Sequence, residues 1–350
     1  MIRRALGVLA CASALLQAAP ALAAAEYKIV TASERGTYIQ IGRDLANFVA
    51  PAADITLETL PSAGSAENVR RLRFEPGVKF ALVQSDVYQA FIDQAREGNT
   101  EAARMVNPLR VIMPLYNEEI YFIVRADAPL EHIHEIRDKK LNVGPLGSGT
   151  ALSSTTLYRL MFGAPIADDN ASYLSNEDAL VKLITDKTLD VVVVVAGQPA
   201  KLLTEMKPEV RQYIKLLKLD PAHETTRAAL ATYFPATIST ANYPNLLSED
   251  IAGIAVKAFL VTYNYTGPET VQYLRQFAQS LCRNFPRLQS EGHPKWKEVT
   301  LALPALGKGW SYSPATERHL RACIDQGPSA FTAPKRANCT QQEHVLGLCN

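Results

Sequence analysis

Several common signatures of catalysis are missing from this sequence of 350 residues. It contains no H-E-x-x-H metalloprotease motif, and no G-x-S-x-G elbow surrounds Ser65 or Ser148. No nucleophile, base and orienting group stand at the spacing that these catalytic roles need. We therefore expect a protein that is not an enzyme and that carries no cofactor.

Two phosphate-binding loops are also incomplete. Gly144 and Gly149 have the glycine spacing of a P-loop, but Thr150 follows where that loop requires Lys. Gly147 and Gly149 begin a dinucleotide fingerprint whose third glycine would fall on Leu152. What remains is a glycine-rich turn into a helix, whose free N–H groups and dipole attract anions. The same pattern also suits an ordinary strand-to-helix turn.

An excess of charge of either sign is missing as well. The chain has 36 basic and 35 acidic residues, for a net charge of +1. This balance gives no reason to expect a nucleic-acid or membrane-surface partner.

Long apolar runs are confined to the start of the chain. Arg3 and Arg4 precede the apolar run Ala5–Leu16, and Ala21–Ala23 fits a small-x-small cleavage site. This pattern predicts a signal peptide over residues 1–25, cleaved near Ala23 to Ala25, and the apolar run is too short to span a membrane. Removal of the two arginines leaves a net charge of about −1.

Cysteine is scarce, with five residues in the chain. Four of them follow the signal peptide and lie in the last quarter, and an even number in an exported protein favours two disulfides. Of the three possible pairings, we favour Cys282–Cys323 and Cys339–Cys349. A metal site is the alternative, but no C-x-x-C motif or nearby pair of histidines supports it.

The first part of the chain alternates strand and helix. The apolar segments Tyr27–Ala32, Ile55–Leu60 and Phe80–Val83 are each followed by a helical pattern, which favours a parallel sheet with helices on both faces. Thr37 is positioned to cap the first helix, with Gln40 as its partner in a capping box.

The middle of the chain contains three further candidate strands. Leu109–Tyr116 and Ile120–Val124 are separated by polar residues, of which Glu118 and Glu119 either line a cleft or cross between lobes in solvent. Val191–Val195 is apolar on both faces, as in a central parallel strand. Later segments read as extended or helical, namely Tyr233–Thr240 and Gly253–Tyr263 as extended and Gly267–Pro286 as a long amphipathic helix.

Five turns share one pattern, an apolar strand followed by small or polar residues that open a helix. They are Ser33–Tyr38, Ser62–Asn68, Gln84–Asp86, Gly144–Thr150 and Gly197–Gln198. Ligands of open α/β sheets bind at the carboxyl ends of strands, so the set suggests a cleft between two α/β lobes. Each turn taken alone could be only a helix cap. We expect His132 and His134 to be an exposed pair and not a metal site. An exported, non-catalytic protein of this kind indicates a solute receptor.

Seven segments together resemble the TAXI family of solute receptors, the TRAP-associated extracytoplasmic immunogenic group. They are Gly36–Gly42, Ser62–Leu72, Phe80–Asp86, Val143–Thr150, Leu189–Ala200, Tyr233–Ile238 and His293–Pro314. The resemblance is collinear over roughly Tyr27–Gln326. It implies a type II-like periplasmic-binding-protein fold, in which two α/β lobes are joined by crossing hinge segments. It also implies a small carboxylate ligand, an amino acid or a dicarboxylate such as glutamate, and delivery to a membrane-embedded TRAP transporter.

The resemblance also implies a division of the chain and a ligand site. Residues 26–116 and 233–327 would form the first lobe, residues 117–232 the second, and residues 328–350 a cysteine-closed tail. The ligand-facing residues, carried over by position, are Thr37, Tyr38, Ser65, Gln84, Ser85, Ser148, Gly149, Thr150 and Gln198. Arg35 replaces part of a glycine-rich loop, and it either pairs with the carboxylate or is held at the surface by Glu34. The alternative partner is a membrane signalling protein, and a periplasmic α/β enzyme is a more distant alternative.

Overall fold

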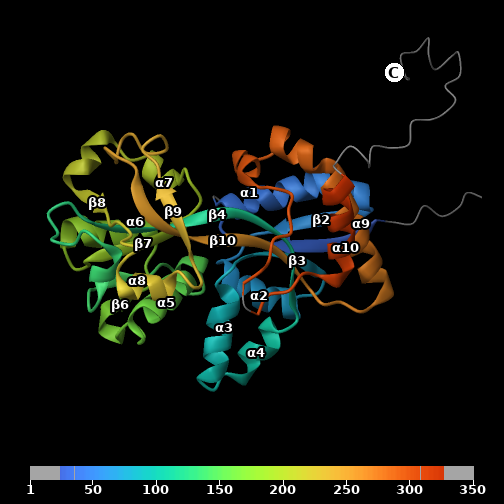
Figure 1. The fold of residues 1–350 in the computed structure, drawn as a ribbon, viewed down its shortest axis with the longest axis horizontal. Helices are drawn as coiled ribbons and strands as arrows, with labels where there is room; N and C mark the ends of the chain where they lie inside the picture. The colour runs from blue at the N-terminus through green and yellow to red at the C-terminus, as the bar shows by residue number, and fades with distance from the viewer. Residues whose placement is uncertain (1–23, 35, 308, 327–350) are drawn as a thin grey trace, which may run out of the picture.

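The computed structural model describes residues 24–34, 36–307 and 309–326. Residues 1–23 of the predicted signal peptide, Arg35 and the predicted pair Cys339–Cys349 therefore lie outside the described residues, whereas Ala25, the last residue of the predicted signal peptide, begins the first strand. Within these ranges the chain forms two α/β lobes that share one ten-stranded sheet, in the order β2-β1-β3-β10-β4-β7-β5-β6, with β8 on β4 and β9 on β10 (Figure 1). No helix in the same ranges is long and apolar enough to cross a membrane.

The first lobe is built from alternating strands and helices, as the sequence predicts. Its strands are β1 (Ala25–Val30), β2 (Ile55–Leu60) and β3 (Val78–Gln84), and its first helices are α1 (Thr37–Asp44), α2 (Ser65–Phe74), α3 (Val87–Arg96) and α4 (Thr100–Val106). Strand β1 pairs in parallel with both β2 and β3. The predicted capping box is wrong, because Gly36 is the N-cap of α1 without a side-chain hydrogen bond and Thr37 is already helical.

Two long strands pass from one lobe to the other. They are β4 (Leu109–Arg125) and β10 (Ile251–Tyr263), which pair antiparallel along most of their length (Figure 1). The prediction of two strands broken at residues 117–119 is wrong. Glu118 and Glu119 stay in the strand because their backbones lie opposite Val256 and Ala255 of β10. The sheet is therefore mixed, with β10 antiparallel to β3 as well.

The second lobe surrounds the valine-rich strand. Its strands are β5 (Leu141–Asn142), β6 (Ala171–Ser172), β7 (Val191–Ala196), β8 (Ile214–Leu216) and β9 (Phe234–Ile238), and its helices are α5 (Gly149–Phe162), α6 (Asn176–Val181), α7 (Lys201–Thr204) and α8 (Glu224–Ala229). Strand β7 lies between β4 and β5, parallel to β5, and Val191 to Val194 are buried. Its predicted place inside the sheet is confirmed, because a run that is apolar on both faces needs cover on both.

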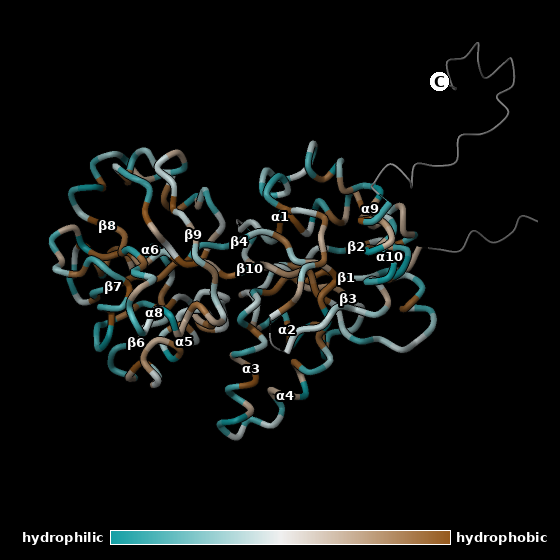
Figure 2. The backbone as a smooth tube through the Cα atoms, in the orientation of Figure 1, coloured by the Kyte–Doolittle hydropathy of each residue, from teal (hydrophilic) through white to brown (hydrophobic). Residues whose placement is uncertain are grey.

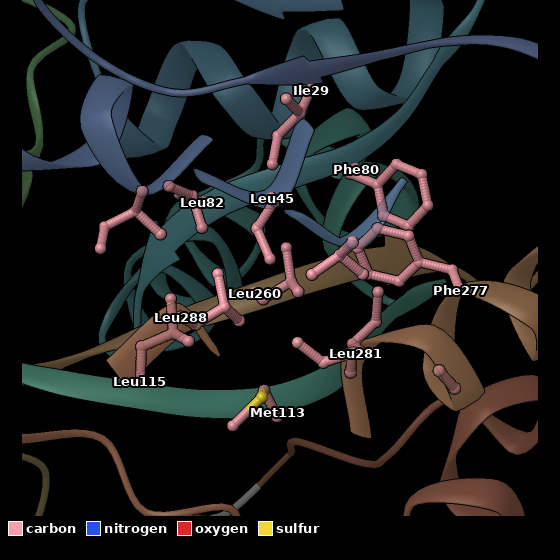
Figure 3. Close-up of a cluster of buried hydrophobic side chains, with 14 of the residues drawn as sticks. Ile29, Leu45, Phe80, Leu82, Met113, Leu115, Leu260, Phe277, Leu281 and Leu288 are labelled. Carbon is pink, nitrogen blue, oxygen red and sulfur yellow. The ribbon is translucent and has the colours of Figure 1, made fainter. Parts of the chain in front are cut away.

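The chain returns to the first lobe through α9 (Pro268–Glu291) and α10 (Pro314–Gln326). A disulfide joins Cys282 of α9 to Cys323 of α10, with their Cα atoms 6.3 Å apart, which confirms this predicted pairing. The apolar face of α9 packs on the sheet, and Figure 3 shows Phe277 against Phe80, with ring centroids 4.5 Å apart.

Most buried apolar side chains pack within one lobe or the other. Figure 2 shows hydrophobic segments along the inner strands of each lobe and hydrophilic ones in the outer loops. Two clusters of buried side chains lie in the first lobe, one of which also contains Leu152 of α5, and two others gather around β7. Ile238 and Tyr243 pack in the same cluster as Val192, and Val256 packs with Val193. We therefore propose that the second lobe continues past residue 232, to the point where β10 crosses back.

Candidate ligand-binding cleft between the lobes

The N-terminus of α5 contacts the first lobe directly. Helix α5 packs against α2, α3 and β3, and a Cβ atom at Gly64 would lie 2.7 Å from the backbone nitrogen of Gly149. A side chain at Gly149 would overlap the amide of Gln84. Because two backbones meet here without side chains between them, the structure describes the lobes in a closed arrangement.

Three of the predicted residues form the first-lobe side of this contact. Ser65 is 1% exposed and its Oγ accepts a hydrogen bond from the backbone nitrogen of Gln84 at 3.0 Å. The same hydroxyl donates to Gln84 Oε1 at 3.2 Å. The Ser85 side chain is bound to the sheet, because its Oγ accepts a hydrogen bond from the backbone nitrogen of Lys257 in β10 at 3.2 Å. Ser65 thus holds the Gln84 side chain in place beside Gly149.

A buried carboxylate joins the lobes next to this contact. Asp86 follows β3, is fully buried, and accepts a hydrogen bond from the hydroxyl of Tyr233 at 2.7 Å. Neither Asp86 Oδ1 nor the Oγ of neighbouring Ser153 in α5 has a well-oriented hydrogen-bond partner among the described residues. Burial raises the pKa of Asp86 to about 6, partly offset by the hydroxyls of Ser153 and Tyr233.

The crossing strand β4 adds two more buried carboxylates. Glu118 accepts a hydrogen bond from the Tyr38 hydroxyl at 2.7 Å. Burial raises the pKa of Glu118 to about 7, with Tyr38 opposing the shift and the charges of Glu119 and Asp86 adding to it. Glu119 accepts from the backbone nitrogen of Gln198 at 2.9 Å. Glu118 and Glu119 are 7% and 5% exposed on the crossing strand, so the alternative of a crossing in solvent is wrong, and a role in lining the cleft stays a prediction.

Two cations lie near these acids. Lys295 is 4% exposed and its Nζ is 2.6 Å from Glu298, and its charge lowers the pKa of Glu119 against the larger raising effect of burial. Lys257 of β10 is the second, because the charges of Glu119 and Glu298 act to raise its pKa against the larger lowering effect of burial. The three buried carboxylates and Glu298 still outnumber these two ammonium groups, which leaves this part of the cleft wall acidic.

The predicted residues of the second lobe use their side chains within that lobe. Ser148 caps α5 by accepting from the backbone nitrogen of Ala151 at 3.0 Å, and Thr150 accepts from that of Val195 at 3.3 Å. Gln198 donates to the carbonyl of Thr237 at 2.8 Å and accepts from the backbone nitrogen of Ser239. This leaves the backbone N–H groups in the first turn of α5 as the donors that face the first lobe.

Two residues predicted for the site remain, Thr37 and Arg35. Thr37 is half-buried at the start of α1, next to Tyr38, and Arg35 lies outside the described residues. A cavity of about 630 Å³ lies between α2, α3 and α5, and of the described residues that the sequence predicts for the site, Ser148 alone lines it.

Sequence reasoning missed Asp86 and Tyr233 as site residues. Asp86 stood in one of the five turns, so its place at the end of a strand before a helix was a usable signal. Tyr233 stood in Tyr233–Ile238, one segment of the family resemblance, but nothing in the sequence linked it to Asp86, because it lies 147 positions away and only the fold brings the two together. Lys295 is likewise delivered by a distant turn, η7 (Pro294–Glu298).

Two α/β lobes, joined by the crossing strands β4 and β10 and in contact at the N-terminus of α5, give the chain a two-lobed α/β fold. The chain belongs to the NMT1-like family, whose model matches residues 29–321.

Solved structures with the same overall organisation are distant. The chain is 14% identical to the periplasmic binding protein BugD, with 88% of this chain and 96% of that chain covered and a TM-score of 0.45. For a TctC solute binding protein from Polaromonas the values are 16%, 86%, 98% and 0.40. For a putative periplasmic sulfonate-binding protein, SsuA from Methylobacillus flagellatus, they are 11%, 88%, 88% and 0.44. Similarity at this level says nothing about the ligand.

Proposed function

We propose that the chain is a periplasmic receptor of the TAXI type, which captures a small carboxylate and delivers it to a TRAP-type transporter without turning it over. The observation that carries this proposal is the meeting of the α5 N-terminus with Gln84 and the buried acids of the first lobe. A helix start of this kind holds a carboxylate through backbone N–H groups and the helix dipole. Release of an intact ligand then requires only that the lobes separate.

Among small carboxylates, the acids of the cleft favour an α-amino acid as the ligand. Asp86 and Glu118 are buried, and Asp86 Oδ1 makes no well-oriented hydrogen bond among the described residues, although the Ser153 hydroxyl is near enough to lower the pKa of Asp86. An ammonium group would satisfy that oxygen and relieve the repulsion between the acids, because opposite charges stabilise each other in a desolvated site. A dicarboxylate without an ammonium group would instead add negative charge to an acidic wall.

Glutamate and glutarate form a matched pair for this proposal, since they differ only in the ammonium group. We expect glutamate to bind about tenfold more tightly than glutarate, because its ammonium group adds one ion pair in a partly buried site. Isothermal titration calorimetry gives both affinities, after a thermal-shift screen of amino acids and dicarboxylates has ranked the ligands.

Asp86→Asn should remove most of the preference, and the exposed Asp325→Asn should leave it intact. Glutarate binding as tightly as glutamate would overturn the amino-acid assignment alone. If none of the screened solutes shifts the melting temperature, the receptor proposal itself fails for small carboxylates.

A further inference from the structure

Three histidines lie together in the second lobe, away from the cleft. His132 precedes the short turn η3 (Ile133–Ile136), whose Ile133 and Ile136 are buried at 1% exposure and anchor it to the core. His223 is the N-cap of α8. The prediction of an exposed histidine pair is wrong, because His132 and His134 are both half-buried.

The rings form a stack with His134 at its centre. The ring of His134 lies 3.8 Å from that of His223, with 3° between their planes, and 5.3 Å from that of His132, with 9°. The Nδ1 atom of His134 is buried and has no hydrogen-bond partner among the described residues. Burying such an atom without a partner costs free energy, so the position calls for a ligand.

Glu135 completes a set of three ligand atoms. One nitrogen of His132, one nitrogen of His134 and one carboxylate oxygen of Glu135 lie within 4.8 Å of one another. Glu135 Oε2 accepts hydrogen bonds from the backbone nitrogens of Glu131 and His132, at 2.6 Å each. These bonds fix the carboxylate while leaving Oε1 free of them.

We propose that His132, His134 and Glu135 bind one divalent transition-metal ion, for which zinc is the best match. Two imidazoles and a carboxylate suit zinc, whereas magnesium and calcium prefer sites built from oxygen atoms. Ligand atoms around tetrahedral zinc are about 3.4 Å apart, and an imidazole binds a metal in the plane of its own ring. The side chains therefore need to move closer together, and the ring of His132 has to turn out of the stack with His134. His223 is a positioning residue, since its Nδ1 is 2.9 Å from Thr225 Oγ1 and its ring packs on His134.

The site would brace the helix that forms one wall of the cleft. Turn η3 contacts α8, and α8 packs against α5, whose N-terminus meets the first lobe. An ion bound at η3 would therefore stabilise the second lobe without entering the ligand site, by the mass-action effect of any ligand that binds only the folded state.

Zinc titration of the untagged mature chain, stripped with EDTA, tests this proposal. Calorimetry should show one Zn²⁺ per chain, and Zn²⁺ but not Mg²⁺ should raise the melting temperature. His134→Ala and the conservative Glu135→Gln should each weaken Zn²⁺ binding about 10- to 100-fold. His319→Ala removes a histidine from α10 and should change nothing.

Three outcomes would overturn the site. The wild-type chain could fail to bind Zn²⁺, Mg²⁺ could bind equally well, or Zn²⁺ binding could survive both substitutions. Circular dichroism of the two variants shows that they are folded before they are titrated, and Glu135→Gln keeps an acceptor for the two backbone N–H groups.

Discussion

Replacing Gly149 with valine should weaken ligand binding on the order of 1000-fold, because the closed state that binds the ligand would become rare. The new side chain would overlap the amide of Gln84, which Ser65 holds in place. Gly149 lies at the first position of α5, outside the left-handed backbone region, so valine adds no backbone strain there. The second lobe should fold normally while the two lobes stay apart.

Calorimetry with the best amino-acid ligand measures this loss, and small-angle X-ray scattering should show a larger radius of gyration for the variant. Gly307→Val is the matched control, because nothing lies within 4 Å of a Cβ atom at Gly307. Unchanged affinity in Gly149→Val would mean that the contact of α5 with Gln84 is not part of the ligand-bound state.

Glu118→Gln should make the ligand-free protein about 3 kcal/mol more stable at pH 8, since each unit of pKa shift is worth about 1.4 kcal/mol. Burial raises the pKa of Glu118 from its ordinary value of 4.5 to about 7 in the folded protein. The folded state therefore binds this proton more tightly than the unfolded state, and its contribution to stability is lost as pH rises from about 4.5 to 7. Glutamine keeps an acceptor for the Tyr38 hydroxyl and has no charge to bury.

Urea unfolding at pH 4.5, 6 and 8 measures this difference. The advantage of Glu118→Gln over the wild type should be near zero at the lowest pH and greatest at the highest, and exposed Glu26→Gln should show no such trend. Asp86, with a pKa of about 6, keeps a smaller slope of the same sign in both proteins. A variant less stable than the wild type at pH 8 would contradict the assignment of an unfavourable buried charge.

Local patterns predict most of the fold. The units around β1, β2 and β3 follow from alternating apolar segments and helix starts, and the valines of β7 from the absence of any polar face. The polar residues at 117–119 misled the prediction, because a strand that is paired along its length tolerates charged side chains when tyrosine and backbone groups receive them. That pairing depends on β10, more than 130 positions later.

Local sequence predicts only part of the candidate site. The turns at Ser65, Gln84 and Gly149 were identified, and they do come together. The expectation placed the side chains of Thr150 and Gln198 against the ligand. In the structure they form hydrogen bonds within the second lobe. Asp86 stands out as a site residue only through its hydrogen bond with Tyr233, and no periodicity in the sequence predicts that contact.

The continuous pairing of β4 with β10 has a consequence for how opening would be observed. Residues 117–119 lie at the crossing, yet they stay in register with 255–257 in the ladder. Opening by a twist of this ladder breaks few backbone hydrogen bonds, so deuterium uptake at the crossing would stay slow whether the lobes are open or closed. The motion would be recorded instead at the first turn of α5, which loses its contact with the first lobe when the lobes part.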